Sequence, residues 1–380
     1  MEKFDLSIRN KRVILALGAE SAGNFSVYKN GDVHFSEGFG DLIEEKNFTE
    51  YKESLLAFLK KEQVEPGVIL SDLHPLFRTT ALAQELAAKY GAEYVPVQHH
   101  IAHIFSAIGD EIVSNSEKPK KCSPKDCFGI ACDGTGYGFD EKIWGGEIYS
   151  LQQAAGSIRC TRIGHLENQI LLGGELAVKE PARIMISILG KILSKKEVYG
   201  HVRKHYSRNE FELLWNQLEQ NFNCLETSST ARILDAASVM LGFSKNERLS
   251  KHGPVKMLEE NSAKPYALKP IVEADEKENL LVLKTTPLFE YLINNIDKDR
   301  NRLAATAQKY LADGLLRLIG LQSDSPEPQF IYFAGGMADN AIMSGILGAQ
   351  GAYLNKKIPR GDAGISFGQI FYILLADPRN

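Results

Sequence analysis

Residues 127–140 read CFGIACDGTGYGFD, and residues 142–151 continue as KIWGGEIYSL. Apolar residues dominate both stretches and glycines separate them, which predicts two strands of a hairpin. A similar pattern occurs earlier, where residues 15–28 read LALGAESAGNFSVY. Two glycine-turn hairpins, each followed later by helices, indicate a duplicated lobe, although the two copies are too dissimilar to prove a duplication.

Between and after these hairpins, strand and helix patterns alternate. The step Lys29-Asn30-Gly31-Asp32 is a strong hairpin-turn signal that leads into a further strand over residues 33–35. The remaining periodicities predict helices over residues 48–62, 79–90, 101–108, 302–319 and 340–351, and strands over residues 67–74, 95–98 and 329–336. Residues 166–260 are mainly helical in pattern, whereas residues 265–285 are expected to be loop-rich. This alternation predicts an α/β layer structure.

A polar, proline-bearing segment over residues 114–126 divides the two patterns and suits an exposed linker. The sequence therefore predicts an N-terminal lobe over residues 1–126 and a C-terminal lobe with helical insertions over residues 127–380. The C-terminal helix is expected to pack back on the first lobe.

Composition restricts the class of protein. The chain has 380 residues, of which 44% are hydrophobic and 24% are charged, so it can bury a large core. Its net charge of −4 produces no overall electrostatic field that would attract nucleic acid or an anionic membrane. No apolar run reaches the length of a membrane span, and the first residues lack a signal-peptide pattern. Five cysteines, an odd number, are interpreted as free thiols in a reducing cytoplasm.

Two histidines are the first candidate site residues. His99 and His103 in the stretch QHHIAH are four residues apart, so both imidazoles lie on one face of a helical turn and can share a metal ion. His100 should point away from the pair. Histidines that cap a helix or pack in a core give the same spacing, and for an isolated pair this structural interpretation is favoured.

Two aspartates beside glycines are the next candidates. Asp133 ends an apolar run and precedes Gly134, Thr135 and Gly136, where a glycine turn can approach a phosphate while the carboxylate holds a cation. A plain hairpin turn is the alternative. Asp362, in the turn PRGDAGIS, could complete a set of two histidines and two carboxylates, which suits iron, zinc or manganese.

A second glycine pair follows the strand at residues 329–336. Gly335 and Gly336 lead through Asn340 into a helix, a geometry that suits the phosphates or base of a nucleotide. Glycine pairs after strands are common, so this motif is weak by itself. The chain contains no P-loop, no H-E-x-x-H zinc motif and no G-x-S-x-G elbow. Ser228, Ser229 and Thr230 are interpreted as a helix N-cap rather than as nucleophiles.

Taken together, the order and flanks of these motifs resemble the C-terminal domain of the hydrogenase maturation protein HypF, a relative of the threonylcarbamoyl-transferring TsaD proteins. The resemblance runs from about residue 13 to residue 376. It is carried by LALGAE, SDLHP, VQHHIAH, DGTGYGFDEKIWGGE, GHLENQILLGGELAVKEPAR, TSSTARILDAASVMLG, FAGGMADN and GDAGISFGQ.

The resemblance implies a two-lobed actin-like/sugar-kinase fold built on duplicated ribonuclease-H-like sheets. It implies that His99, His103, Asp133 and Asp362 bind a divalent transition metal, iron or zinc. It also implies a surrounding nucleotide site made by Gly134, Thr135, Gly136, Gly173, Gly174, Gly335, Gly336 and Asn340, with Lys179, Arg183 and Asp235 in matching motifs.

The activity implied is a carbamoyltransferase. A separate YrdC-type protein would make carbamoyl-adenylate from carbamoyl phosphate and ATP, and this chain would pass the carbamoyl group to a cysteine thiol of an acceptor such as HypE. None of the 380 residues resembles the activating domain, so the chain alone is not expected to make the adenylate. Ala22, His252 and Ala341 replace residues usual in the family. The alternatives are therefore a nucleotide-binding scaffold of a maturation complex and an ATP-dependent kinase or ATPase of the same fold.

Overall fold

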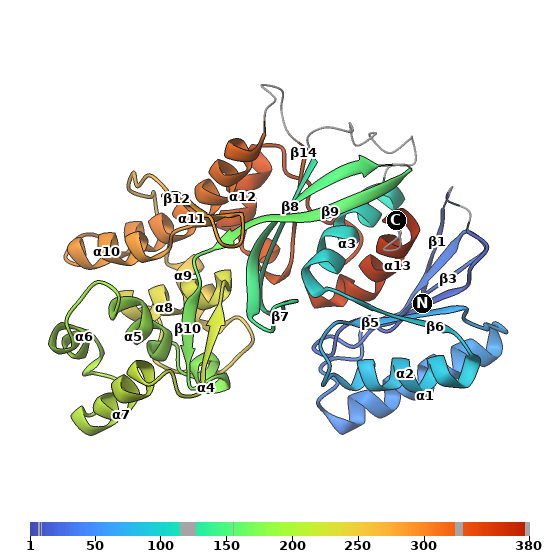
Figure 1. Cartoon of the computed structure of the whole chain (residues 1–380), viewed down its shortest axis with the longest axis horizontal. Coiled ribbons are helices and arrows are strands. Elements are labelled where there is room, and N and C mark those ends of the chain that lie inside the picture. The colour runs from blue at the N-terminus through green and yellow to red at the C-terminus, as the bar shows by residue number, and fades with distance from the viewer. Residues whose placement is uncertain (7, 9, 115–126, 155, 324–329, 377–380) are drawn as a thin grey trace.

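The computed structural model describes residues 1–6, 8, 10–114, 127–154, 156–323 and 330–376. It has two β-sheets, each covered by its own helices, with two further helices between them (Figure 1). Within the described part of the chain, no helix combines the length and the apolar character that crossing a bilayer requires. The segment expected as a linker over residues 114–126 lies outside the described residues, apart from Ser114.

The first sheet has the strand order β1-β4-β3-β2-β5-β6. Its strands are β1 (Glu2–Asp5), β2 (Ile14–Ala16), β3 (Ser26–Lys29), β4 (Asp32–Phe35), β5 (Val68–Asp72) and β6 (Glu93–Val97). The predicted turn joins β3 to β4, with Asn30 and Gly31 at positive φ and Lys29 paired with Asp32. Strands β2, β3 and β4 are antiparallel neighbours, whereas β5 and β6 add in parallel beside β2.

The second sheet repeats this arrangement. Its strands are β7 (Cys127–Tyr137), β8 (Ile143–Ala154), β9 (Ser157–Leu166), β10 (Gln169–Leu172), β11 (Cys224–Thr227), β12 (Val272–Asp275), β13 (Leu280–Leu283) and β14 (Phe330–Ala334). Strands β7, β8 and β9 form an antiparallel meander, and β14 pairs in parallel with β7. The order β9-β8-β7-β14 therefore matches β4-β3-β2-β5, which is the duplication that the two hairpins indicated.

The helices follow the predicted periodicities, with some additions. They are α1 (Glu45–Lys61), α2 (Arg78–Tyr90), α3 (His99–Ser114), α4 (Glu175–Lys179), α5 (Ala182–Leu189), α6 (Lys195–Val202), α7 (Arg208–Glu219), α8 (Thr230–Leu241), α9 (Gly253–Glu260), α10 (Thr286–Asn294), α11 (Arg300–Gln322), α12 (Ala341–Ala349) and α13 (Ile365–Leu375), with the 3₁₀ turns η1 (Gly336–Asp339) and η2 (Asp362–Gly364). Ser229 caps α8 as expected, because its hydroxyl accepts the Arg232 N–H.

Three features of the local structure differ from the sequence patterns. The segment over residues 265–285 is loop-rich as expected but also contains the hairpin β12–β13. Asp133-Gly134 is not a hairpin turn, because β7 continues through a bulge between Cys132 and Gly136 and the chain turns later, where the Gly138 N–H donates to the Lys142 carbonyl. Helix α3 begins at His99, two residues before the predicted start, so the histidine pair lies within the helix, as its spacing indicated.

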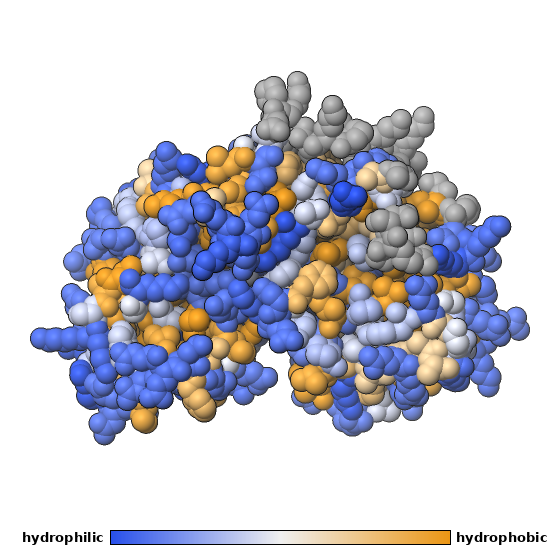
Figure 2. All heavy atoms as spheres, in the orientation of Figure 1, coloured by the Kyte–Doolittle hydropathy of each residue, from blue (hydrophilic) through white to orange (hydrophobic). Residues whose placement is uncertain are grey.

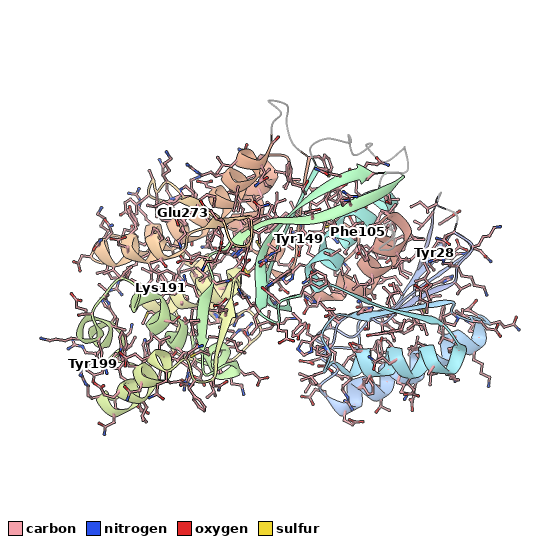
Figure 3. The ribbon with its side chains drawn as sticks, in the orientation of Figure 1. Tyr28, Phe105, Tyr149, Lys191, Tyr199 and Glu273 are labelled. Carbon is pink, nitrogen blue, oxygen red and sulfur yellow. The ribbon has the colours of Figure 1, made fainter. Side chains whose placement is uncertain are left out.

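Helices α3 and α13 form the layer between the sheets (Figure 1). A Cβ at Gly368 of α13 would lie 1.9 Å from the Ala102 carbonyl of α3, so only glycine allows the two helices to cross this closely. Side chains of α3 and α13 share a buried apolar cluster with residues of both sheets. Figure 3 labels three aromatic members of this cluster, Tyr28 on β3, Phe105 on α3 and Tyr149 on β8. This middle cluster joins the lobes into one core.

Phe367 of α13 tests the importance of this middle cluster. Its fully buried ring makes edge contacts with Phe4 of β1 and Phe35 of β4. Truncating a buried phenylalanine leaves a cavity, so we expect Phe367→Ala to lower the free energy of unfolding by about 3–5 kcal/mol in a urea titration. Phe222→Ala is the matched control, because Phe222 is 70% exposed and its loss should change stability by less than about 0.5 kcal/mol. Equal unfolding midpoints for both variants would contradict the central role of α13.

Candidate metal centre and the surrounding site

The four residues that the sequence singled out as metal ligands lie together between the sheets. His99 is the first residue of α3 and His103 lies one turn further along it, Asp133 comes from the bulge of β7, and Asp362 comes from η2 just before α13. One donor atom from each lies within 4.8 Å of every other. The side chains of His99, His103 and Asp133 are buried and Asp362 is nearly so.

The spacing of the donor atoms fits a small cation. His99 Nε2 lies 3.1 Å from His103 Nε2 and 3.1 Å from Asp133 Oδ2. His103 Nε2 lies 3.6 Å from Asp133 Oδ2, and both imidazoles lie 3.5 Å from Asp362 Oδ1. A tetrahedral ion with bonds of about 2.1 Å has donors about 3.4 Å apart. The set also carries two carboxylates, which balance a divalent charge.

Three of the four ligands are held in place by a second contact, whereas the Nδ1 atom of His103 has no hydrogen-bond partner among the described residues. His99 Nδ1 lies 2.6 Å from Asp72 Oδ2 at the end of β5, an arrangement that fixes the tautomer and leaves Nε2 toward the cluster. The Gly336 N–H donates to Asp133 Oδ1 at 3.3 Å. Asp362 Oδ2 accepts from Lys251 Nζ at 2.8 Å and from the Ser21 hydroxyl. Each aspartate thus keeps one oxygen for the histidines.

Burial and charge shift the pKa values of this cluster. Burial disfavours the charged imidazole of His99, but Asp72, Asp133 and Asp362 outweigh it and raise its pKa well above the usual value. For Asp133, burial and the nearby Asp362 are outweighed by hydrogen bonds from His103 and His99, so its pKa lies below the usual range. The carboxylates are therefore ionised, as metal binding requires, whereas His99 must release a proton when a metal binds.

His100 points away from the pair, as expected. Its Nδ1 lies 3.0 Å from Gln98 Nε2, and its ring stands 6.2 Å from the Trp144 ring. Burial, followed by the nearby His99, lowers its pKa well below the usual value, so the ring is neutral. A Cβ at Gly136 would lie 2.3 Å from His100 Cε1, so the glycine of the bulge allows β7 to approach α3.

The residues expected around a nucleotide divide into two groups. Gly134, Gly335 and Gly336 adjoin the cluster, and Thr135 is the exposed side chain of the bulge. Gly173 and Gly174 instead form a turn before α4, and the nearest atoms around them belong to Arg183, Leu176, Gln217, Asn223 and Leu225. Their assignment to a nucleotide stays a prediction.

Three other predicted residues have partners in the structure. Asn340 caps α12 through its Oδ1, and its Nδ2 donates to Glu259 and Gln308, so its amide supports the site wall. Asp235 is buried and lies 2.9 Å from Arg232. Lys179 is exposed, and its carbonyl accepts the Arg248 N–H. The roles of these residues toward a nucleotide also stay predictions.

A pocket of about 260 Å³ lies beside Gly336. Its walls include Met337 and Asn340 on one side and His252, Val255 and Glu259 on the other. The sequence did not single out Val255 and Glu259 of α9 as site residues, and it also missed Asp72, Ser21 and Lys251, which contact the candidate ligands. Of these residues, only Asp72 had a local signal in the sequence, because it is a polar residue at the end of a buried strand.

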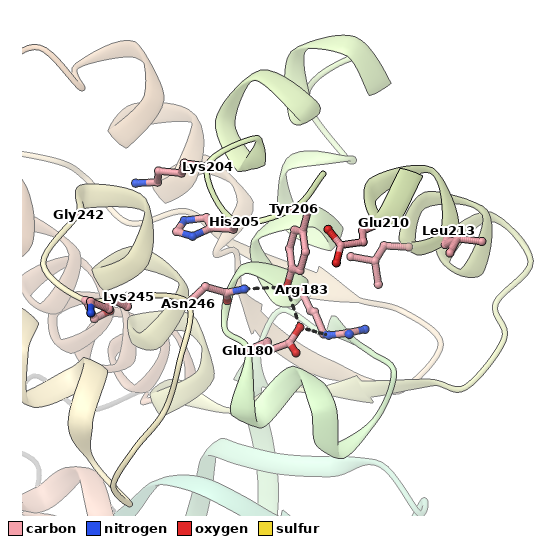
Figure 4. A pocket seen from close by; sticks show the side chains of 12 residues that line it. Glu180, Arg183, Lys204, His205, Tyr206, Glu210, Leu213, Gly242, Lys245 and Asn246 are labelled. Carbon is pink, nitrogen blue, oxygen red and sulfur yellow. Dashed lines mark hydrogen bonds and ion pairs between the residues drawn. The ribbon is translucent and has the colours of Figure 1, made fainter. Parts of the chain in front are cut away.

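A larger pocket of about 760 Å³ lies elsewhere, among α5, α6, α7 and the segment after α8 (Figure 4). Glu180 accepts from Arg183 Nε at 2.7 Å and from the Tyr206 hydroxyl at 3.0 Å, and Asn246 Nδ2 donates to the same hydroxyl. These groups satisfy one another, and none of the lining residues belongs to the metal-ligand set. The cluster beside Gly336 therefore remains the candidate site, although its pocket is smaller.

Two lobes with the same strand order and a buried site between them define the actin-like/sugar-kinase class of α/β proteins, as expected. Residues 129–369 match the family model described as a carbamoyltransferase, Kae1-like domain, second subdomain, and residues 9–110 match the HypF Kae1-like domain. The chain therefore belongs to the family of HypF carbamoyltransferase Kae1-like domains.

Relatives and solved structures agree with this membership. The chain is 33% identical to "Probable carbamoyltransferase HypF" of Methanocaldococcus jannaschii over 98% of its own length and 48% of the relative's. It is 29% identical to a "Carbamoyltransferase HypF homolog" of Cupriavidus necator, covering 94% of this chain and 90% of that one. The chain thus spans about half of the first relative and most of the second.

Two crystal structures superimpose on the whole described architecture. Full-length HypF in the phosphate- and nucleotide-bound form gives a TM-score of 0.84 at 25% identity, covering 98% of this chain and 57% of that one. HypF of T. kodakarensis gives 0.83 at 28% identity, covering 98% and 48%. These matches agree with the expected fold class.

Gly136 provides a test of the geometry of the site. Because its Cβ would overlap the His100 ring, we expect Gly136→Ala to lower the free energy of unfolding by about 1–3 kcal/mol. Gly200→Ala in α6 is the control, since a Cβ there meets nothing within 4 Å and should stabilise by up to about 1 kcal/mol. Denaturant titrations of both variants give the comparison. A Gly136→Ala protein as stable as the wild type would show that β7 and α3 are not this close.

Proposed function

We propose that this chain is a metal-dependent carbamoyltransferase that accepts carbamoyl-adenylate and passes the carbamoyl group to a protein thiol. The observation that supports it most is the convergence of His99, His103, Asp133 and Asp362 beside a pocket, within a chain of the HypF carbamoyltransferase family. Hydrogenase maturation is the process that the family implies. The adenylate would come from a separate YrdC-type protein, and an acceptor such as HypE would supply the thiol.

The four ligands suit iron or zinc, because two imidazoles with two carboxylates form a borderline donor set. Such an ion supplies a Lewis acid that polarises a carbonyl or phosphoryl oxygen. Asp72 orients His99 for this task, and Gly336 orients Asp133. The ligand atoms lie in a largely buried site, so water that could hydrolyse the acyl phosphate is restricted.

The pocket beside Gly336 suits the nucleoside of the adenylate. At about 260 Å³ it is just below the range of about 300–1,000 Å³ for drug-sized ligands, and Val255 and Met337 give it apolar walls. Gly336 links this pocket to the cluster through the hydrogen bond from its N–H to Asp133. A nucleoside bound here would place its 5′ phosphate toward the ligands. The acceptor sulfur would then bond to the carbonyl carbon as the bond from that carbon to the phosphate oxygen breaks.

We expect the purified wild-type chain to bind one iron or zinc ion, as measured by elemental analysis after reconstitution. Removing one of four ligands lowers affinity sharply, so His103→Ala should lose the ion. His201→Ala is the control, because His201 lies on α6 and is not among the four clustered ligands. Circular dichroism checks that both variants fold. The assignment fails if the wild type holds no stoichiometric metal, or if a folded His103→Ala binds as much as the control.

The transfer reaction has its own test. We expect the chain, given carbamoyl phosphate, ATP and a thiol acceptor, to form no thiocarbamate until a YrdC-type protein is added. Asp133→Asn should abolish the product with that protein present, and His201→Ala should not. Steady ATP hydrolysis or phosphorylation of a small molecule by the chain alone would instead favour a kinase. Nucleotide binding without transfer, even with preformed adenylate and acceptor, would favour a scaffold.

A further inference from the structure

A buried arginine of α8 lies directly against the bulge of β7. Arg232 is in the first turn of α8 and is only 1% exposed. Its Nη2 lies 3.2 Å from the position that a Cβ of Gly134 would occupy. The guanidinium therefore lies beside a residue without a side chain, one position after the metal-ligand candidate Asp133.

The hydrogen-bonding capacity of Arg232 is largely unused. Its Nη1 forms an ion pair with Asp235 Oδ2 at 2.9 Å, but neither Nη1 nor Nε has a hydrogen-bond partner among the described residues. A buried donor without a partner costs free energy, and more so on a charged group. Arg232 thus has hydrogen-bonding capacity that no described protein group uses.

Arg248 brings a second positive charge, which is close enough to interact with Arg232, Asp235 and Asp133. It lies in the segment between α8 and α9, it is half-buried, and in the described part of the chain its Nε also lacks a hydrogen-bond partner. Burial, followed by repulsion from Arg232, lowers the pKa of Arg248 to about 10, against the opposing effect of Asp235 and Asp133. The guanidinium remains charged at neutral pH. Two arginines therefore face one buried carboxylate, Asp235, whose own pKa is raised by burial.

The start of α8 faces the same bulge. The Ser229 hydroxyl lies 2.6 Å from the Gly134 carbonyl oxygen and 3.0 Å from that of Asp133, which fixes the helix N-terminus against β7. A helix N-terminus carries a partial positive charge and favours an anion. The helix dipole and the Arg232 guanidinium thus both favour an anion beside the glycine of the bulge, and Arg248 adds a second positive charge near Arg232.

We propose that Arg232 and Arg248 bind the phosphate of the adenylate, beside Gly134 and the segment that joins α8 to α9. This inference rests on the proposed function and names the side chains that bind the phosphate of the leaving AMP. Guanidinium groups suit a phosphate because their planar forks can donate two hydrogen bonds to it. When the bond from carbamoyl carbon to phosphate oxygen breaks, its electron pair stays on that oxygen. AMP then gains negative charge where two arginines can stabilise it.

The test compares AMP with adenosine, because the two ligands differ only in the phosphate. Isothermal titration of the full chain should show that AMP binds the wild type more tightly than adenosine. Arg248→Gln should weaken AMP roughly 10- to 100-fold, the effect of losing a charge-assisted hydrogen bond, and change adenosine by less than about twofold. Arg248→Lys should restore part of the AMP affinity. Arg208→Gln, an exposed arginine of α7, is the charge-matched control and should alter neither affinity.

Arg232→Met is the second variant, and a urea titration establishes whether it folds. Since Arg248 is half-buried and makes no described side-chain hydrogen bond through Nε, its variant tests the inference even if Arg232→Met does not fold. Equal loss of AMP and adenosine in Arg248→Gln would mean a structural role and overturn the subsite. If the wild type binds AMP no more tightly than adenosine, the phosphate subsite is overturned, although the nucleoside still binds. Binding of neither ligand would reject the proposed function, and the subsite with it.

Discussion

The contact between Asp72 and His99 joins the two lobes at the site. Asp72 ends a strand of the first sheet, His99 begins α3, and the other nitrogen of the same imidazole reaches Asp133 in the second sheet. All three side chains are buried, and buried ionisable groups are costly unless each has its partner. The position of one sheet relative to the other therefore depends on the contacts that run from Asp72 through His99 to Asp133. Lys251 reinforces it from the opposite direction, because its ammonium group bonds Ser21 after β2 and Asp362 before α13.

Local pattern predicted the elements whose signals are strong and short-ranged. The Asn30-Gly31 turn and the helices α1, α2 and α11 follow directly from turn chemistry and periodicity. Strand β1 went unrecognised because only Phe4 among its four residues is buried, so it offers no alternation to detect. Hairpin β12–β13 was missed for a similar reason, since β12 has no fully buried residue. The bulge in β7 depends on the approach of α3, which no local pattern records.

The site residues could be predicted where they lie close together in sequence or in motifs that the chain shares with the family. Spacing by one helical turn pairs His99 with His103, and the family resemblance added Asp133 and Asp362. Arg248 and Lys251 escaped notice because they reach the site from a segment without periodicity. Lys251 meets an aspartate 111 residues away and a serine 230 residues away. Contacts at such separations arise from the assembled fold, and a single sequence carries no trace of them.

The position of helix α13 determines the order in which the two lobes can complete their folding during synthesis. Its residues are synthesised after those of both sheets, yet Phe367 packs on Phe4 and Phe35 of the first sheet. On the ribosome, the strands that emerge first must wait with this apolar face uncovered until α13 arrives. The first lobe is thus completed only after the strands of the second sheet have been made, against the usual N-terminal-first order of domain folding. During that interval the exposed face is a surface for chaperones, and a product released before α13 is complete presents it for aggregation.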